Sequence, residues 1–292
     1  MPASSTTLRV APHTVRMPCP PWRALSVAGL ACATLLAAGP AAEADSVGTS
    51  ANWSGYVASR AGVAFRAVSA GWVQPTVTCS DGRTAVASPW IGLGGYHRTS
   101  QALEQIGTDA QCSASGRASY SAWYELVPAA SRTIRMTISA GDSLSASVQV
   151  RGRVVRLRLS DATTGATFTK TITASVVDVT SADWIVEAPS ECAGSVDPNA
   201  CRTLPLADFG TAGFSAARAT TLAGHSGAIA DTAWSRAAIR LAPAAGARFG
   251  GGPGPGGGPP DTLSVAGAAP SALTAGGSAF DVAYEQDASS GT

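Results

Sequence analysis

The stretch Ser181–Pro189 contains the first residue whose type and setting could do chemistry. Its sequence, Ser-Ala-Asp-Trp-Ile-Val-Glu-Ala-Pro, is typical of a short strand, because β-branched and aromatic residues precede a proline that cannot continue a central ladder. Side chains alternate along a strand, so Asp183, Ile185 and Glu187 share one face. Glu187 is therefore either the solvated end of a half-buried strand or a carboxylate fixed on a sheet for acid–base work.

A second glutamate makes paired-carboxylate chemistry a candidate. The chain has only six Glu, and Glu125, like Glu187, lies among aromatic and apolar residues. Two carboxylates across the cleft of a β-sandwich can hydrolyse a glycosidic bond. Four aromatic residues could then stack on sugar rings, or they could fill an ordinary sandwich core: Trp90, Trp123, Tyr124 and Trp184. Both interpretations stay open at this point.

Other catalytic arrangements have less support. His13 lies in the N-terminal segment, and His97 and His225 belong to no H-E-x-x-H motif or cysteine–histidine cluster. We therefore expect no metal and no cofactor. Residues 224–228 (Gly-His-Ser-Gly-Ala) have the outline of a nucleophile elbow, but that motif requires a strand–turn–helix setting in an α/β sheet. They are predicted to form a Gly/Ser turn.

The elements that must position these residues are short strands. From Asp45 onward, alternating segments are separated by Gly, Pro, Ser and Asn, with no convincing helical period. This pattern predicts an all-β fold, an antiparallel β-sandwich. We expect one domain over residues 45–292. The Gly/Pro-rich run 250–260 is predicted to be a loop within it, because too little chain follows to fold alone.

The first 44 residues have the pattern of a signal peptide. Arg9, Arg16 and Arg23 precede an apolar run at 24–38, and residues 42–44 (Ala-Glu-Ala) have the A-x-A form of a cleavage site. The apolar run is too short to span a membrane. The sequence therefore predicts cleavage after residue 44 and a secreted protein.

Charge and cysteine content narrow the partners and the compartment. The chain has a net charge of +1 and only 13% charged residues, so nucleic acid and anionic membranes are poor partner candidates. Beyond the leader there are four cysteines, at positions 79, 112, 192 and 201. This even number is consistent with two disulfides in an exported protein.

Five sequence blocks in a fixed order resemble the glutamic peptidases (eqolisins). In chain order they are Trp90 to Gly95 with Leu103 to Asp109 (W-x-G-x-x-G…Q-x-G-x-D), Tyr120 to Pro128 (containing A-W-Y-E-x-x-P), Ile138 to Ser143 (I-S-x-G-D-S), Thr163 to Gly165, and Ala182 to Glu187. No single block is specific, but their joint order is. The resemblance runs from about Asn52 to Phe214, most of the chain after the leader.

The resemblance implies a catalytic dyad of Gln105 and Glu187. It also implies two packed antiparallel sheets of about seven strands each, a concanavalin- or lectin-like jelly roll with a concave substrate face. Glu187 as a carboxylate would take a proton from the water that attacks the scissile carbonyl and return it to the leaving amine. Gln105 would hold that water and donate an amide N–H to the developing oxyanion.

The same resemblance places four further residues in the cleft wall or behind the dyad: Trp90, Asp109, Trp123 and Glu125. Glu125 could raise the pKa of Glu187 by like-charge repulsion, or it could hydrogen-bond Gln105 and fix its orientation. The sequence leaves these two roles open.

The resemblance also bears on the cysteines and on two departures. The segment from Cys192 to Cys201 resembles the local disulfide loop that follows the catalytic Glu, which leaves Cys79 and Cys112 to pair by elimination. The usual Asp of W-x-G-x-D-G is Gly94 here, and the residue before A-W-Y-E, often Asp, is Ser121. Both departures remove carboxylates near the expected cleft, and they bear on subsite preference and pH optimum.

The sequence thus predicts a secreted, monomeric, acid-acting endopeptidase that needs no metal or cofactor and takes polypeptide substrates. Two alternatives remain. One is a sandwich glycoside hydrolase using Glu125 and Glu187, and the other is a non-catalytic sandwich that binds glycans or peptides.

Overall fold

The computed structural model describes residues 46–192, 201–242 and 266–286, apart from a few side chains at the ends of these ranges. The chain divides into a unit of residues 1–42 and a unit of residues 43–292, and the second contains all of the described residues. The predicted signal peptide and the predicted loop at 250–260 both lie outside the described residues. None of the described residues forms a helix that could span a membrane.

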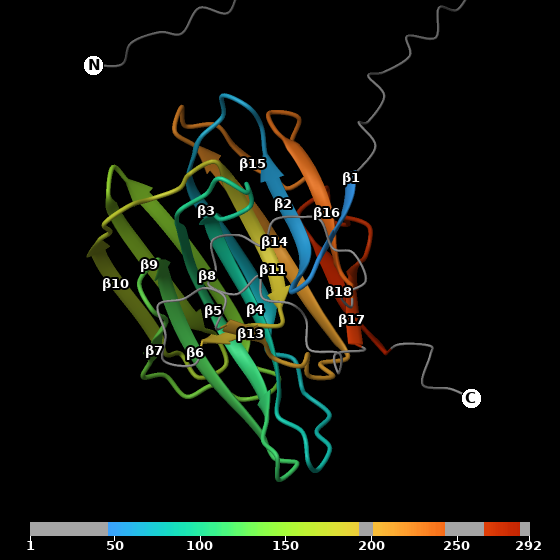
Figure 1. Cartoon of the computed structure of the whole chain (residues 1–292). Helices are drawn as coiled ribbons and strands as arrows, with labels where there is room; N and C mark the ends of the chain where they lie inside the picture. Colours follow the sequence, from blue (N-terminus) through green and yellow to red (C-terminus); the bar gives the residue numbers. More distant parts are fainter. Residues whose placement is uncertain (1–45, 193–200, 243–265, 287–292) are drawn as a thin grey trace, which may run out of the picture. The chain divides into compact units, whose positions relative to one another are not determined.

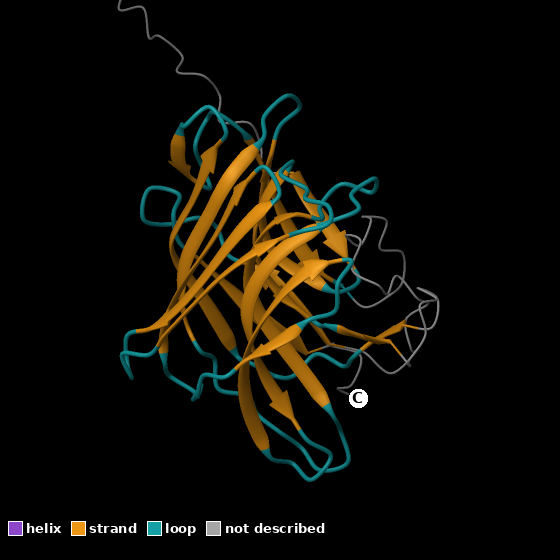
Figure 2. Ribbon diagram, turned by 90° about the vertical axis from the view of Figure 1, so that its left-hand side faces the viewer, coloured by secondary structure: helices purple, strands orange, loops and turns teal. Residues whose placement is uncertain are grey.

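The described residues form strands and loops without helix, as Figure 2 shows. In chain order the strands are β1 (Ser46–Ser50), β2 (Trp53–Ser59), β3 (Phe65–Val73), β4 (Ala85–Gly94), β5 (Leu103–Cys112), β6 (Ala118–Val127), β7 (Arg132–Ile134), β8 (Ser143–Arg151), β9 (Val154–Asp161), β10 (Thr167–Thr173), β11 (Ser181–Glu187), β12 (Ser190–Cys192), β13 (Cys201–Thr203), β14 (Thr211–Thr221), β15 (Ser226–Ala228), β16 (Ser235–Leu241), β17 (Ala266–Pro270) and β18 (Phe280–Gln286). The predicted all-β class is confirmed.

Strand pairing is antiparallel throughout the described sheet except for β1, which pairs with β16 in parallel. The main path runs β10-β9-β8-β3-β14-β18-β17-β16-β2-β11-β4-β5-β6-β7. Figure 1 shows β8, β9 and β10 on one side and β16, β17 and β18 on the other. The predicted antiparallel arrangement is confirmed, and hydrogen bonding continues along the whole path.

The path folds back so that its two halves pack against each other. Strands β4 and β5 contact β8 and β9 although they do not pair with them, and β11 likewise contacts β3 and β14. The main hydrophobic core lies between these halves and contains side chains from both, among them Ile91, Ile106 and Trp184 on one side and Val148 and Leu157 on the other. The sheet is therefore sandwich-like, with its core enclosed between two layers.

Two tryptophans tie the layers together across this core. The indole N–H of Trp184 on β11 donates to the carbonyl oxygen of Ser69 on β3 at 3.0 Å. The indole N–H of Trp72 on β3 donates to the Thr108 hydroxyl on β5 at 3.1 Å. Trp184 is fully buried, so it is a core residue and is not available to stack on a sugar.

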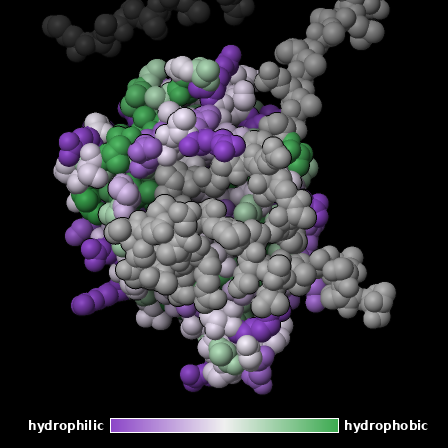
Figure 3. All heavy atoms as spheres, in the orientation of Figure 1, coloured by the Kyte–Doolittle hydropathy of each residue, from purple (hydrophilic) through white to green (hydrophobic). Residues whose placement is uncertain are grey.

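The outer surface is polar with a few apolar side chains. Exposed valines occur at Val154, where β9 begins, and at Val176, after β10. Figure 3 shows the hydrophobic side chains of this view gathered mainly toward the side where β9 and β10 lie in Figure 1. Scattered exposed valines are normal for a protein surface.

Candidate active site

One face of the strands β2, β11, β4, β5 and β6 carries the residues that the sequence singled out. In the pairing register, Glu187 lies beside Trp53 and Ser88, Trp90 lies beside Ile185 and Gly107, Gln105 lies beside Gly92 and Glu125, and Gly107 lies beside Trp123. Residues paired across neighbouring strands project to the same face of a sheet. We call this face, turned away from the main core, the site face.

Period-two alternation explains the spacing of the motif Q-x-G-x-D. Gln105, Gly107 and Asp109 project to the site face, while Ile106 and Thr108 between them are fully buried on the core side. The same rule puts Trp123 and Glu125 of the A-W-Y-E block on the site face. In each motif, every second residue projects to the site face, and the residues between them pack in the core.

The site face has an apolar cluster of its own. It consists of Trp53, Val57, Trp90, Leu103, Trp123, Val127, Ile185 and Ile239, with Tyr96 packed against it. The rings of Trp53 and Trp90 meet edge to face, with centroids 5.0 Å apart, an arrangement that aromatic pairs favour. Polar groups on this face therefore lie in an apolar environment, where their electrostatic interactions are stronger.

Glycines make room for Trp90 on this face. A Cβ at Gly107 would lie 2.5 Å from the Trp90 Cβ and 2.6 Å from the Pro89 carbonyl oxygen, and one at Gly92 would lie 3.1 Å from the Trp90 ring. These distances are below ordinary contact, so no side chain fits at Gly107 without moving β4. Trp90, fully buried, is held over the glycines between the positions of Gln105 and Glu187.

The carboxylate of Glu187, the last residue of β11, accepts hydrogen bonds on both oxygens. Trp90 Nε1 donates to Oε2 at 2.8 Å, and Asn52 Nδ2 donates to Oε1 at 2.8 Å. Burial raises the pKa of Glu187 to about 8, and the Glu125 charge adds to this, while the bonds from Trp90, Trp53 and Asn52 lower it. Glu187 as a whole is of intermediate exposure.

Gln105 is held in a fixed orientation by Glu125. Its Nε2 donates to Glu125 Oε2 at 2.7 Å, and its own side chain is 4% exposed. Its Oε1 is buried, and no described residue donates a hydrogen bond to it. Glu125 thus accepts a hydrogen bond from the Gln105 amide, and its charge adds to the rise in the pKa of Glu187.

Asp109 on β5 lies level with Glu187 on β11, and Ser88 on β4 lies between them. Its carboxylate accepts hydrogen bonds from the Ser88 hydroxyl at 2.6 Å, from Gln111 Nε2 at 3.2 Å and from the Ser121 hydroxyl at 3.2 Å. Burial raises the pKa of Asp109, and these hydrogen bonds oppose the rise. Ser121, one of the two departures, thus serves here as a donor to Asp109.

The other departure, Gly94, is explained by Asp178 in the loop before β11. Gly94 has a φ of 82°, and a Cβ there would lie 2.5 Å from the Cβ of Asp178. Asp178 accepts hydrogen bonds from Ser100, Thr180 and the Gly95 amide, and these bonds outweigh burial and lower its pKa. A carboxylate is therefore present next to the end of β4, and it is supplied by residue 178 instead of residue 94.

One of the two expected disulfides is present in the described residues. Cys79 and Cys112 are joined, with their Cα atoms 5.3 Å apart, which confirms the pairing predicted by elimination. Strands β12 and β13 place the backbones of Cys192 and Cys201 opposite each other. The side chains of these two residues lie outside the described part of the chain, so their disulfide stays a prediction.

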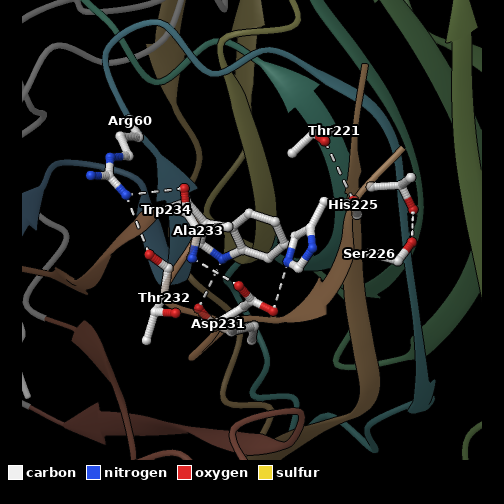
Figure 4. Close-up of polar contacts among 10 residues, drawn as sticks. Arg60, Thr221, His225, Ser226, Asp231, Thr232, Ala233 and Trp234 are labelled. Carbon is white, nitrogen blue, oxygen red and sulfur yellow. Dashed lines mark hydrogen bonds and ion pairs between the residues drawn. The ribbon is translucent and has the colours of Figure 1, made fainter. Parts of the chain in front are cut away.

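The segment 224–228 forms a turn and the short strand β15, as predicted, without a nucleophile elbow. His225 Nε2 lies 3.0 Å from Asp231 Oδ2, and its ring meets Trp234 edge to face. The Ser226 hydroxyl instead bonds the Thr220 hydroxyl at 2.6 Å. Figure 4 shows the His225 ring turned to Asp231 and away from Ser226, so no Ser–His pair forms.

Two residues of the site were missed in the sequence, Asn52 and Trp53. Trp53 packs on Trp90, and Asn52 hydrogen-bonds Glu187 from 135 positions away. No local spacing links Asn52 to Glu187. The available signal was the adjacent pair Asn52-Trp53 near the start of the family resemblance, which gives no indication of a partner.

The geometry thus describes a hydrolytic type of site, with a buried, hydrogen-bonded carboxylate and an oriented amide on one sheet face. The model of the Peptidase A4 family matches residues 51–240, so the chain belongs to this family. The resemblance to glutamic peptidases and the predicted enzyme class, a glutamic-type endopeptidase, are confirmed.

Solved structures with the same fold include three glutamic peptidases. Scytalido-glutamic peptidase with a peptide-based transition state analogue is 24% identical, with a TM-score of 0.61 over 80% of this chain and 98% of that one. SCP-B, an eqolisin in complex with the tripeptide Ala-Ile-His, is 23% identical, with a TM-score of 0.59 over 80% and 98%. Aspergilloglutamic peptidase from Aspergillus niger is 26% identical, with a TM-score of 0.51 over 69% and 99%. A search of curated protein sequences gave no significant match.

Proposed function

We propose that the protein is a secreted endopeptidase in which Glu187 activates a water molecule and Gln105 stabilises the oxyanion. The observation that carries this proposal is the pair of oriented groups on one sheet face. Glu187 is held by Trp90 and Asn52, and Gln105 is held by Glu125. Secretion rests on the predicted signal peptide of residues 1–44, and the substrate class, polypeptides, rests on the family.

The proposed reaction needs only these two groups and water. The Glu187 carboxylate takes a proton from water as the water oxygen attacks the scissile carbonyl carbon. The free N–H of the Gln105 amide donates to the oxyanion that forms. Its Oε1, to which no described residue donates a hydrogen bond, accepts from the water in this proposal. Glu187 then passes the proton to the leaving nitrogen as the C–N bond breaks. Acid and base are the same residue at two stages.

The pH optimum is a separate part of the proposal. A general base must be ionised, so kcat/KM falls as pH drops below the pKa of Glu187. The family resemblance implies an acidic optimum, whereas a pKa raised to about 8 favours activity nearer neutrality. A profile from pH 3 to 9 decides between them, since the acid limb reports the pKa of Glu187.

The arrangement of the sheet supports the predicted division into two sheets of seven strands. Strands β16 and β17 are joined through a single residue pair, Leu241 with Ala268, whereas other neighbours on the path pair over several residues. Cutting the path there leaves seven strands on each side. We propose that β16 and β17 mark the boundary between the two sheets.

The experiment that tests the function is cleavage of denatured casein by the purified protein at pH 4 and pH 7. Glu187→Gln should reduce turnover by about 10³-fold through loss of the base, and Gln105→Ala by about 10²-fold through loss of the oxyanion donor. Casein cleavage that survives Gln105→Ala undiminished would refute the dyad.

A parallel panel of glycans separates the alternatives. A glycoside hydrolase using Glu125 and Glu187 would release sugar and would not depend on Gln105, and a binding module would turn over neither substrate. The hydrogen bond from Gln105 to Glu125 favours the peptidase, because it gives Glu125 a supporting role.

A further inference from the structure

Asn52 contacts Glu187 from outside every motif of the site. It lies between β1 and β2, and its Nδ2 donates to Glu187 Oε1 at 2.8 Å. Glu187 Oε2 accepts from Trp90, and a hydrogen bond from Trp53 also lowers the pKa of Glu187. Asn52 lies just before β2 and Trp90 lies on β4, so the donors come from different parts of the chain and limit rotation of the carboxylate about its last bond.

The Asn52 amide is itself held in place. The Ser50 hydroxyl donates to Asn52 Oδ1 at 3.2 Å, which directs Nδ2 toward Glu187. The Asn52 backbone carbonyl accepts a hydrogen bond from the Ala188 amide at 2.8 Å. Asn52 therefore holds both the side chain of Glu187 and the backbone of the next residue.

The charges around Glu187 give this contact a definite electrostatic sign. Among the described residues, the titratable groups facing Glu187 are Glu125, whose charge raises its pKa, and Asp109, held across Ser88. Neither supplies a positive charge. The carboxylate is therefore stabilised only by neutral donors, and a hydrogen bond to an ionised group favours the ionised form.

We propose that Asn52 is a positioning residue that orients the Glu187 carboxylate for attack and favours its ionised form. The part concerning catalysis rests on the proposed function, whereas the part concerning ionisation does not. Because an amide does not titrate, Asn52 gives this support at every pH. Asn52 is also the first residue of the sequon Asn52-Trp53-Ser54, so a glycan attached there would remove one of the two N–H groups of the amide that supports Glu187.

The test uses Asn52→Leu, which keeps the size of the side chain but removes the donor, and Asn52→Asp, which replaces it with a second carboxylate. Ser54→Ala is the matched control, because it destroys the sequon without touching the Asn52 amide. The Ser54 hydroxyl is buried on the core side of β2 and is not among the groups that contact Glu187. Far-UV circular dichroism and thermal melts identify variants that fold.

Two readouts follow the ionisation of Glu187. The first is the acid limb of kcat/KM on a peptide substrate. The second is NMR titration of the protein with ¹³C-carboxyl-labelled glutamate, in which six Glu at most are present and Glu187→Gln identifies the Glu187 signal. The NMR measurement does not require the protein to be a peptidase.

Asn52→Leu should move both the acid limb and the NMR midpoint to higher pH by about one unit, the size expected for a lost hydrogen bond to a charged group. Asn52→Asp should split the titration into two steps, as coupled carboxylates do. Ser54→Ala should match the wild type. An unmoved NMR midpoint in folded Asn52→Leu would overturn the inference. A shifted midpoint in a protein that cleaves no peptide would retain the ionisation role and refute the proposed function.

Discussion

Two buried glutamates on the same part of the sheet have opposite surroundings. Glu187 on the site face accepts a hydrogen bond on each oxygen and keeps some exposure. Glu104, one residue before Gln105, is fully buried, and neither of its oxygens accepts a hydrogen bond of normal geometry from a described residue. Burial raises the pKa of Glu104 to about 9, backbone hydrogen bonds from Asp178 and from Glu104 itself oppose this rise, and the nearby Asp178 charge adds to it.

The difference shows how donors decide what a buried carboxyl can do. The hydrogen bonds to Glu187 lower its pKa, which is still raised to about 8, so the carboxylate is available as a base as the pH approaches that value. Without side-chain donors of this kind among the described residues, Glu104 holds its proton over most of the pH range. A second fully buried acid nearby, Asp183, also has a pKa raised well above its usual value, mainly by burial, with the Asp178 and Glu104 charges adding to it. Glu104 and Asp183 together therefore make the folded protein sensitive to high pH.

The largest expected effect is on stability at high pH, through Glu104→Gln. Below pH 4.5 both folded and unfolded chains hold the Glu104 proton, so it does not affect stability there. Between pH 4.5 and about 9 only the unfolded chain releases it, so stability falls by about 1.4 kcal/mol per pH unit from this residue. Glu104→Gln removes that slope, and urea unfolding at pH 4, 6 and 8 measures it.

The control for this prediction is Glu285→Gln, which changes a partly exposed glutamate paired with Arg240. It should leave the pH dependence close to that of the wild type. If Glu104→Gln and wild-type stability fall in parallel from pH 4 to 8, Glu104 is not a buried neutral acid and the contrast with Glu187 is lost.

The next effect concerns the support of Glu187 by Trp90. Gly107→Ala forces a methyl group against the Trp90 Cβ and the Pro89 carbonyl oxygen, and overpacking of this kind costs about 1–3 kcal/mol. The displaced Trp90 ring should weaken its hydrogen bond to Glu187, so kcat should fall together with the melting temperature. An unchanged melting temperature and an unchanged kcat would contradict this prediction, because they would show that Trp90 can move to accommodate the added methyl group.

The smallest effect is expected from Glu125→Gln. The new amide oxygen can still accept the hydrogen bond from Gln105, while the charge that raises the pKa of Glu187 is removed. The acid limb of kcat/KM should therefore move to lower pH, by up to about one unit. An unmoved acid limb would mean that Glu125 acts only by orienting Gln105, and a shift to higher pH would contradict the effect of its charge on Glu187.

The sequence predicted the site better where its signals were local. Alternation along the strand at residues 181–187 predicted that Asp183, Ile185 and Glu187 share one face, and the pairing register agrees, because period-two geometry is a property of each strand. Gln105, Asp109 and Glu125 were placed in the site by the family resemblance instead. The all-β class likewise followed from many short segments separated by turn residues. These predictions needed no knowledge of which strands pair.

Contacts between distant strands could not be predicted in the same way. Asn52 reaches Glu187 only because β2 pairs with β11, and Trp184 proved to be a core residue only once the two layers were in place. Glu104 shows a further limit, because alternation indicates that it faces the core but not that its oxygens lack a hydrogen bond of normal geometry from a described residue. Such features depend on several strands at once.

The exchange at Gly94 has a consequence for recognising relatives of this protein. A search pattern that demands an acid in W-x-G-x-D-G would reject this chain, although the Asp178 side chain occupies the volume next to that position. The same charge has been supplied from a loop 84 positions later in the chain, and the left-handed glycine makes the space for it. Patterns written in three-dimensional positions would treat the two arrangements as equivalent.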